Sequence, residues 1–343
     1  MNKATSPSSI LISVVIPHWN HFALLDACLA ALAPQVTPRH EVIVVDNGST
    51  DGSPELLERR HPWVRIIRLS ANVGFSGAVN RGAKASSGQA VAVLNNDTRP
   101  APDWLAQLEH GLAEYPDAGF FGCRILREAP ANCIDSVADG MSTAGYGFKE
   151  GWGELDGPQF DQPRWITAAS AAAALYRRKL LDETGGFDES YFAFEEDLDL
   201  ALRAQLLGYR CRYLPAARVV HRVRATAGPL GDLPVYLCYR NLISTLIKTF
   251  PGTVFVRCAP AIVAHLTLAG LNQTLRGRGR AFARGVAGAL RRLPRTWRQR
   301  RQLQLTRRIN SKQFYLLLEP RWWRRKLRLL RLRKLTHKDR IDG

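Results

Sequence analysis

The sequence has no closely spaced cysteines. Its cysteines occur singly along the 343 residues, with no CxxC pair and no zinc-like spacing: Cys28, Cys123, Cys133, Cys211, Cys238 and Cys258. This distribution indicates neither a structural zinc site nor a disulfide framework. We therefore expect reduced and mostly buried thiols in a cytosolic protein.

Three other signals are missing. The N-terminus has no apolar run of signal-peptide length, because the stretch that begins at Ile10 is short and ends at Pro17, so secretion is not expected. The chain has neither a P-loop nor a GxGxxG pattern, so these two modes of nucleotide binding lack support. Residues 254–275 are apolar but interrupted by Arg257, Pro260 and other breaks, and fall short of a clean membrane-spanning run.

Acidic residues are scarce in the last quarter of the chain. Residues 251–343 hold 24 Lys and Arg against 3 Asp and Glu, whereas residues 1–250 hold 24 against 27. The net charge of +18 therefore belongs to the C-terminal part. With 46% hydrophobic and 23% charged residues, the chain is globular. The asymmetry predicts a nearly neutral body with a cationic extension for an anionic surface, either membrane or nucleic acid.

Strand and helix patterns alternate in the first hundred residues. Runs rich in β-branched residues, typical of strands buried on both faces, occupy residues 10–16, 41–45, 64–69 and 90–94, and an amphipathic helix is expected at 22–32. This order predicts an α/β fold with a mainly parallel sheet and helices on both faces.

Polar residues follow these strands, at the edge of the sheet where α/β proteins bind ligands. Asp46 and Asn47 follow the second strand, and a Gly- and Asn-rich stretch at residues 70–82 offers backbone N–H groups to an anion such as a phosphate. Asn95 to Asp97 follow the fourth strand, and carboxylates there suit Mg²⁺ or Mn²⁺. Ordinary capped turns remain the alternative at each of these positions.

The most acidic segment lies between residues 187 and 221. Its acids precede a predicted helix and a strand that ends at His221: Asp188, Glu189, Glu195, Glu196, Asp197 and Asp199. Clustered carboxylates are costly to ionise, so such clusters mark metal sites or general bases. Acids favoured by the dipole at a helix N-terminus are the alternative.

Five segments in this order resemble the family 2 glycosyltransferases of GT-A fold, in particular bacterial rhamnosyltransferase-like members. They are SVVIPHWN, EVIVVDNGSTDGS, ANVGFSGAVNRG, AVLNNDTRP and GGFDESYFAFEEDLDLALRAQLLGYRCRYLPAARVVH. The resemblance covers about residues 10–250 and implies a GT-A-like (Rossmann-like) domain. Residues 10–100 would be its nucleotide-sugar-binding half and residues 101–250 its acceptor and catalytic half. Residues 1–9 would be a flexible N-terminus, and residues 251–343 a basic, helical, membrane-associating extension.

The resemblance assigns the donor and metal positions. The nucleotide-sugar would be bound by residues that follow the strands and by one arginine: Pro17, Trp19, Asp46, Asn47, Asn72, Asn80, Asn96 and Arg240. Asn95-Asn96-Asp97 stands in for the family's DxD motif, with Asp97 as the metal-binding carboxylate and Asn95 in place of the first Asp. His221 matches a family histidine that reaches the metal or the pyrophosphate. Arg240 would meet the diphosphate or, equally, fix its helix to the body through an acid.

The resemblance also assigns the chemistry. FEEDLDL resembles the ED motif, so Asp197 would be the general base on the acceptor hydroxyl, with Glu196 as a supporting or alternative base. The implied reaction is inverting sugar transfer, with Mg²⁺ or Mn²⁺, from a nucleoside-diphosphate donor to a saccharide hydroxyl. The favoured donor is dTDP-L-rhamnose, followed by UDP-hexose or UDP-galactofuranose. The acceptor would be carried on a polyprenyl diphosphate, in synthesis of O-antigen or another cell-surface polysaccharide. A non-catalytic nucleotide-sugar-binding or scaffold protein is the competing class.

Two regions leave alternatives open. Between residues 128 and 165 the aromatics Tyr146, Phe148, Trp152 and Trp165 would stack on sugars or anchor a long loop, and anchoring is favoured. In the basic extension, Arg mixed with Trp and Leu is typical of helices in an anionic membrane interface. No nucleic-acid-binding fold accompanies these charges, so no nucleic acid is expected. The alternative to membrane association is that the extension packs on the body or mediates dimerisation. We expect a cytoplasmic protein, peripheral on the inner face of the plasma membrane.

Overall fold

The computed structural model describes residues 10–223 and 231–321. The predicted flexible N-terminus at 1–9 and the last Arg-, Trp- and Leu-rich stretch, from Trp322 onward, lie outside the described residues.

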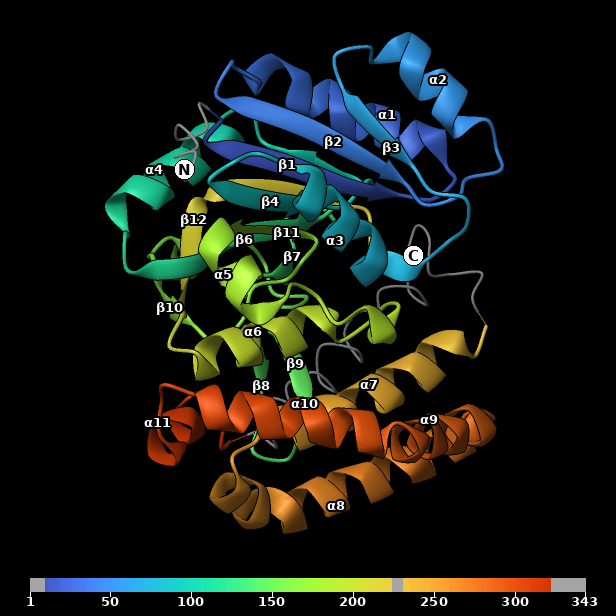
Figure 1. The fold of residues 1–343 in the computed structure, drawn as a ribbon, viewed down its shortest axis with the longest axis vertical. Helices are drawn as coiled ribbons and strands as arrows, with labels where there is room; N and C mark the ends of the chain where they lie inside the picture. Colours follow the sequence, from blue (N-terminus) through green and yellow to red (C-terminus); the bar gives the residue numbers. More distant parts are fainter. Residues whose placement is uncertain (1–9, 224–230, 322–343) are drawn as a thin grey trace, which may run out of the picture.

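A ten-stranded sheet forms the centre of the molecule, in the order β10-β12-β6-β11-β4-β1-β2-β3, with β5 paired to β12 and β7 paired to β6 (Figure 1). Its strands are β1 (Ile12–His18), β2 (His40–Asp46), β3 (Arg65–Arg68), β4 (Ala90–Leu94), β5 (Thr98–Pro100), β6 (Ala118–Arg127), β7 (Ile134–Ser136), β10 (Arg164–Ile166), β11 (Ala173–Arg177) and β12 (Arg210–His221). A separate hairpin pairs β8 (Ala138–Met141) with β9 (Gly147–Glu150).

The first four strands are parallel neighbours, as the alternation of strand and helix predicts. The four strands expected from β-branched runs are confirmed as β1 to β4. Beyond them, β11 runs antiparallel between β4 and β6, while β6 and β12 are parallel to each other. The predicted α/β fold is therefore confirmed, with its parallel part at the N-terminal half.

Helices cover both faces of the sheet and form a further layer at the C-terminal end (Figure 1). They are α1 (Phe22–Leu32), α2 (Ser53–Arg60), α3 (Gly74–Ala85), α4 (Trp104–Glu114), α5 (Arg178–Thr184), α6 (Glu196–Leu206), α7 (Leu233–Thr249), α8 (Gly252–Leu275), α9 (Gly279–Arg291), α10 (Leu293–Thr306) and α11 (Ser311–Leu316). Short 3₁₀ turns lie at η1 (Ala33–Gln35), η2 (Pro158–Phe160) and η3 (Glu189–Tyr191).

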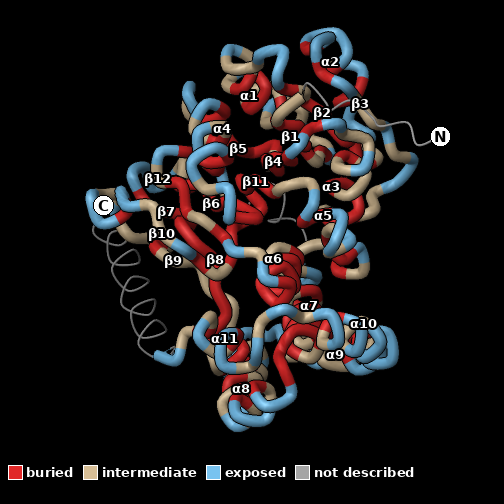
Figure 2. The backbone as a smooth tube through the Cα atoms, turned by 60° about the vertical axis from the view of Figure 1, so that its left-hand side comes forward, coloured by how far each residue is buried: buried red, intermediate tan, exposed pale blue. Residues whose placement is uncertain are grey.

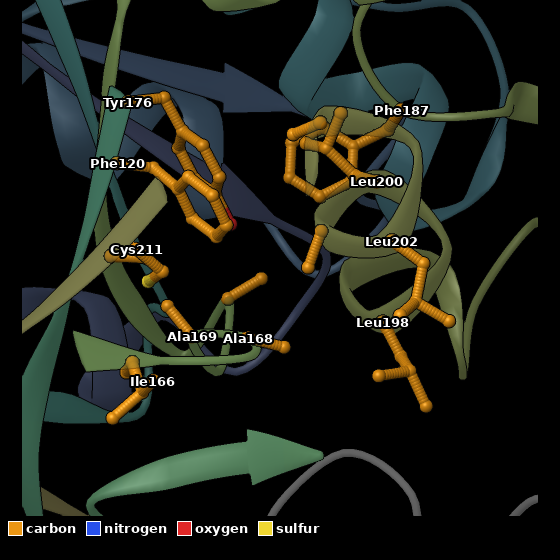
Figure 3. Close-up of a cluster of buried hydrophobic side chains, with 14 of the residues drawn as sticks. Phe120, Ile166, Ala168, Ala169, Tyr176, Phe187, Leu198, Leu200, Leu202 and Cys211 are labelled. Carbon is orange, nitrogen blue, oxygen red and sulfur yellow. The ribbon is translucent and has the colours of Figure 1, made fainter. Parts of the chain in front are cut away.

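Two hydrophobic cores result from the alternation of side chains along each strand. Val14 and Ile16 of β1 point to a core shared with α1 and α4, and Val15 points to a second core shared with α3, α5 and α6. Figure 3 shows part of the second core, where leucines of α6 lie opposite Phe120 and Tyr176 of the sheet. Packing of α6 on all sides fixes the place of its N-terminus.

The helices after residue 250 share the second core. Val254 and Ile262 of α8, Leu303 of α10 and Phe314 of α11 are buried with it, and α7 packs against α9 and α10. The described part of the predicted basic extension is helical, and it packs on the body.

Helix α8 corrects one expectation. By length and composition its 24 residues, with a mean hydropathy of 1.7 over the apolar window, are enough to cross a membrane, whereas the interruptions at Arg257 and Pro260 predicted a run that falls short. Pro260 is accommodated inside the helix. Only 28% of that window is buried inside the protein, and Figure 2 shows the exposed outer side of α8.

Candidate active site

The carboxyl ends of β1, β2 and β4 form one edge of the sheet. His18 at the end of β1 is in register with Asp46 at the end of β2. Asn96, in the turn after β4, donates from Nδ2 to Nδ1 of His18 at 2.9 Å. Burial lowers the pKa of His18 to about 4, which outweighs the raising effect of Asp46. The imidazole is therefore neutral, and its Nδ1 serves as the acceptor for Asn96.

Asn47 fastens the Gly- and Asn-rich loop to this edge. Its Nδ2 donates to Oδ1 of Asn72 at 3.0 Å and to the Gly74 carbonyl at 3.2 Å, and its Oδ1 accepts from the Val73 amide at 2.9 Å. Both ends of the Asn47 amide are thus used within the protein. Asn47, predicted to contact the base, positions the loop at residues 72–74.

Several buried polar atoms at this edge have no hydrogen-bond partner among the described residues: Nε2 of His18, Oδ1 of Asp46 and Oδ1 of Asn95. Buried polar atoms are normally paired, so a group of them at adjacent strand ends indicates a site for a polar ligand. Pro17 and the 37% exposed ring of Trp19 lie at the same strand end and offer apolar surface beside it.

Asp97 and His221 are brought together from different parts of the chain. Nε2 of His221 lies 3.2 Å from Oδ1 of Asp97, and its Nδ1 lies 3.1 Å from Oδ2 of Asp135, which also accepts from Lys149 at 2.9 Å. Burial lowers the pKa of His221, but the two carboxylates outweigh it and raise the value to about 9. His221 is therefore an imidazolium that donates to both carboxylates.

The residues at this point suit a divalent cation. Among the described residues, no group of three or more His, Cys, Asp or Glu has metal-binding geometry. The donor set depends instead on one carboxylate, Asp97, on the unpartnered Oδ1 of Asn95, and on Nε2 of His221 once its proton has left. A carboxylate behind a histidine, as Asp135 stands behind His221, is the usual support of a metal-binding imidazole.

The acidic segment turns sharply before α6. Phe192, Phe194 and Glu195 have φ of 67°, 70° and 66°, a conformation that non-glycine residues seldom adopt. Gly74 at the start of α3 approaches so closely that a Cβ there would lie 2.4 Å from the Phe192 carbonyl. The turn therefore lies against the loop that Asn47 positions.

Asp197 lies in the first turn of α6 and faces a cavity. Its Oδ2 accepts from the Ala171 amide at 3.2 Å and its Oδ1 from the Leu198 amide at 2.8 Å. Burial and the charge of Asp197 raise the pKa of three neighbouring acids: Glu195 to about 8, Asp139 to about 7, and Glu196 well above its ordinary value. Asp197 therefore stands among carboxyl groups that tend to hold protons at neutral pH.

The cavity measures about 610 Å³ and connects the two groups of acids. Its lining includes Asn95, Asp97 and His221 as well as Glu196 and Asp197. Tyr146, Phe148 and Trp152 also line it, while Tyr146 packs against the His265 ring and Trp152 lies under the Arg127 guanidinium. Trp165 lies elsewhere, under the guanidinium of Arg210.

Two predicted donor-binding residues are engaged elsewhere. Asn80 donates to the Phe187 carbonyl at 2.8 Å and accepts from the Phe187 amide at 2.9 Å, which joins α3 to the turn before η3. Arg240 is buried in α7 and donates to the carbonyls of Ser190 and Tyr191 at 3.1 and 2.7 Å. The alternative that Arg240 fixes its helix to the body is correct, although its partners are carbonyls and not acids.

The remaining acids of the segment have structural partners. Asp199 is fully buried and pairs with Arg203 at 2.7 Å and with Lys248 at 2.8 Å. Lys248 also pairs with Asp188 at 2.7 Å. These two acids balance buried cations and lie outside the cavity lining.

Sequence reasoning missed three residues of the cavity region: Asp135, Asp139 and Lys149. They lie on β7, β8 and β9, short strands inside the irregular stretch at residues 128–165. The available signal was the spacing of two acids four residues apart, and it has no periodicity that would point to a face.

The chain is similar in sequence to known proteins. A model of "Glycosyl transferase family 2" matches residues 13–185. The chain is 29% identical over 230 residues to N-acetylglucosaminyl-diphospho-decaprenol L-rhamnosyltransferase of Mycobacterium tuberculosis, covering 60% of this chain and 73% of that protein. It is 30% identical over 242 residues to the succinoglycan biosynthesis protein ExoA of Rhizobium meliloti, covering 67% of each.

Solved structures share the fold at low sequence identity. GalNAc-T7, solved with UDP, GalNAc and Mn²⁺, has a TM-score of 0.58 at 15% identity and covers 71% of this chain and 48% of its own. Residues 1–349 of TarS from S. aureus, in complex with UDP, have a TM-score of 0.54 at 16% identity over 90% of each chain.

Proposed function

Because this chain belongs to glycosyl transferase family 2, we propose that it transfers a sugar, with inversion, from a nucleoside-diphosphate donor to a hydroxyl of a saccharide acceptor. The transfer serves the synthesis of a cell-surface polysaccharide. The observation that supports this most directly is the cavity lined both by the Asp97–His221 pair and by Asp197. Such an arrangement provides one side for a leaving diphosphate and another for an attacking hydroxyl.

On the acceptor side, Asp197 is the general base. The attacking hydroxyl must lose a proton as its oxygen bonds to the anomeric carbon, and a positioned carboxylate receives it. The amides of Ala171 and Leu198 hold the two oxygens of Asp197, which fixes their direction. Glu196 lies beside it and is the secondary candidate for the same role. Because its pKa is raised well above the ordinary value, Glu196 tends to hold its proton, and this favours Asp197 as the base.

On the donor side, Pro17, Trp19 and Asp46 bind the base, and Asn72 and Asn96 line the path of the diphosphate. A Mg²⁺ or Mn²⁺ ion would be held by Asp97 and Asn95, with His221 as a further ligand. When bound, such an ion neutralises charge that develops on the leaving diphosphate. Lys149 adds positive charge to this side of the cavity.

The favoured donor is dTDP-L-rhamnose, supported by the similarity to the mycobacterial rhamnosyltransferase. That protein's name includes a diphospho-decaprenol, which supports an acceptor saccharide on a polyprenyl diphosphate here. UDP-hexose and UDP-galactofuranose are the alternatives.

The protein is proposed to act in the cytoplasm, on the inner face of the plasma membrane. The outward side of α8 carries exposed apolar residues at helical spacing, including Val263 (63% exposed), Leu271 (58%) and Leu275 (89%). Exposed arginines, among them Arg276 and Arg278, follow at the end of this helix. An apolar stripe with adjacent arginines suits an interface with anionic lipid headgroups.

The test is transfer by the purified protein with Mn²⁺, a prenyl-diphosphate-linked saccharide and a panel of donors: dTDP-rhamnose, UDP-glucose and UDP-galactofuranose. Mass spectrometry of the product is expected to show one added deoxyhexose with dTDP-rhamnose. Addition of a hexose instead would show that the donor is one of the two UDP-sugars and not dTDP-rhamnose. Tight donor binding without transfer or donor hydrolysis would favour the non-catalytic class.

A further inference from the structure

The segment that leads into the first turn of α6 has an unusual backbone. Phe192, Phe194 and Glu195 all have φ near +70°, although none is glycine. Such residues keep this conformation only where surrounding contacts impose it. Because Glu196 and Asp197 follow immediately, whatever holds this turn also sets the direction of the proposed base.

The contacts come from the middle of α7. Nδ2 of Asn241 lies 3.1 Å from the carbonyl of Tyr191, 2.9 Å from that of Ala193 and 2.8 Å from that of Phe194. The Asn241 side chain is fully buried. Its two amide hydrogens are therefore shared among three carbonyls of the turn, far from solvent.

Arg240 orients the Asn241 amide and forms further hydrogen bonds to the same turn. Nε of Arg240 donates to Oδ1 of Asn241 at 2.9 Å, which directs Nδ2 of Asn241 toward the turn. Nη2 of Arg240 donates to the carbonyls of Ser190 and Tyr191. Arg292, directly after α9, donates to the Ser190 carbonyl as well. Arg240 and Asn241, adjacent on α7, thus bind the carbonyls of residues 190, 191, 193 and 194.

We propose that Asn241 and Arg240 are positioning residues that hold the turn at residues 190–195 so that Asp197 faces the acceptor. This inference rests on the proposed function. Neither of them lines the cavity, whereas Asp197 does. Their effect is therefore on turnover and not on donor binding.

The test compares Asn241→Ala with Ser244→Ala. Ser244 lies one turn further along α7, is also buried, and donates within the helix to the Arg240 carbonyl at 2.8 Å, so it controls for loss of a buried polar group on the same helix. Arg240→Met, which keeps a long side chain, replaces Asn241→Ala if the latter does not fold.

Hydrogen–deuterium exchange of the unliganded proteins is the first readout. Asn241→Ala is expected to speed exchange of the amides between residues 191 and 198, while β1 and β4 keep wild-type rates; Ser244→Ala should leave both regions unchanged. If the amides of the turn in Asn241→Ala exchange at the same rate as in the wild type, the proposal is overturned. This readout needs no activity, so it stands even if the proposed reaction is wrong.

Steady-state kinetics is the second readout. A displaced catalytic group costs on the order of 100-fold in rate. We expect kcat of Asn241→Ala to fall by about that factor, with the donor KM within about twofold of wild type. A mobile turn with unchanged kcat would contradict the positioning role, as would equal losses in the Ser244 control. Absence of transfer by the wild-type protein with every donor would count against the proposed function alone.

Discussion

The imidazole of His221 lies between two carboxylates, 3.2 Å from Asp97 and 3.1 Å from Asp135. Asp97 follows β4, Asp135 lies on β7 and His221 ends β12. The arrangement joins the predicted metal-binding carboxylate to a second acid that no motif indicated, and Asp97 and His221 line the cavity that Asp197 faces.

Asp197→Asn is expected to lower kcat by roughly 10²–10⁴-fold, because the amide cannot accept the proton of the acceptor hydroxyl. Donor affinity, measured by isothermal titration calorimetry, should stay within a factor of about two, since the amide keeps the shape of the carboxylate. Asp182→Asn, at an exposed position on α5, is the matched control. Near-wild-type turnover of Asp197→Asn would remove Asp197 from the role of base.

Asp97→Asn is expected to abolish most of the Mn²⁺ affinity, and Asp135→Asn to weaken it by roughly 10–100-fold, as is typical when the support of a ligating histidine is lost. Titration of Mn²⁺ followed by electron paramagnetic resonance measures both. Glu128→Gln, near the end of β6 and paired with arginines, serves as the control. Unaltered Mn²⁺ binding by Asp97→Asn would exclude the proposed cation site.

Glu195 predicts a pH dependence of stability. Burial and the nearby Asp197 raise its pKa from 4.5 to about 8. Between these values the unfolded chain has lost the proton that the folded protein keeps, so the free energy of unfolding falls as pH rises. From pH 5 to pH 8 the wild type should lose roughly 2–4 kcal/mol more than Glu195→Gln.

Urea denaturation at several pH values measures this difference. Glu58→Gln, whose side chain is exposed on α2, should follow the wild type across the same range. Parallel pH profiles for the wild type and Glu195→Gln would show that the pKa of Glu195 is not raised in the folded protein.

The outward face of α8 predicts membrane binding that substitution can remove. Val263→Asp combined with Leu271→Asp is expected to reduce co-sedimentation with phosphatidylglycerol vesicles by about tenfold or more, because charges replace the apolar stripe. Leu155→Asp, at a 70% exposed position on the body, is the control. These changes are cleaner than removal of the extension, since α8 also buries Val254 and Ile262 in the core.

Equal binding by the double variant and the Leu155 control would reject α8 as the docking face. Binding that disappears in moderate salt for all proteins alike would instead assign the attraction to the arginines alone.

Local pattern was sufficient for the parallel half of the fold. A strand buried on both faces needs an apolar run, and its end needs polar turn residues, so β1 to β4 and the positions of Asp46 and Asp97 are readable from the chain. The short strands β7, β8 and β9 were not predicted, because short strands in a Gly- and Pro-rich stretch carry no clear period. The small-residue run at residues 166–176 predicts a strand, but nothing in it indicates that β11 lies antiparallel between β4 and β6.

Arg240 and Asn47 illustrate a second limit of prediction from sequence, which concerns the partner that a polar side chain binds. Each stands in a motif that implies contact with the donor, and a guanidinium or an amide binds phosphates and backbone carbonyls equally well. Which partner it has depends on the segment that folding brings opposite it. In this protein that segment is the turn at residues 190–191 for Arg240 and the loop at residues 72–74 for Asn47.

The sequence by itself determined the family, the parallel strands, the acidic segment and the concentration of positive charge after residue 250, because these depend on residue types at short spacing. Only the tertiary structure decided how the acids divide. Asp199 and Asp188 pair with Lys248, Glu195 and Glu196 have raised pKa values, and Asp197 faces the cavity. The physical reason is that the ionisation and role of a carboxylate depend on its burial and on the charges around it, and both are set by elements distant in the chain.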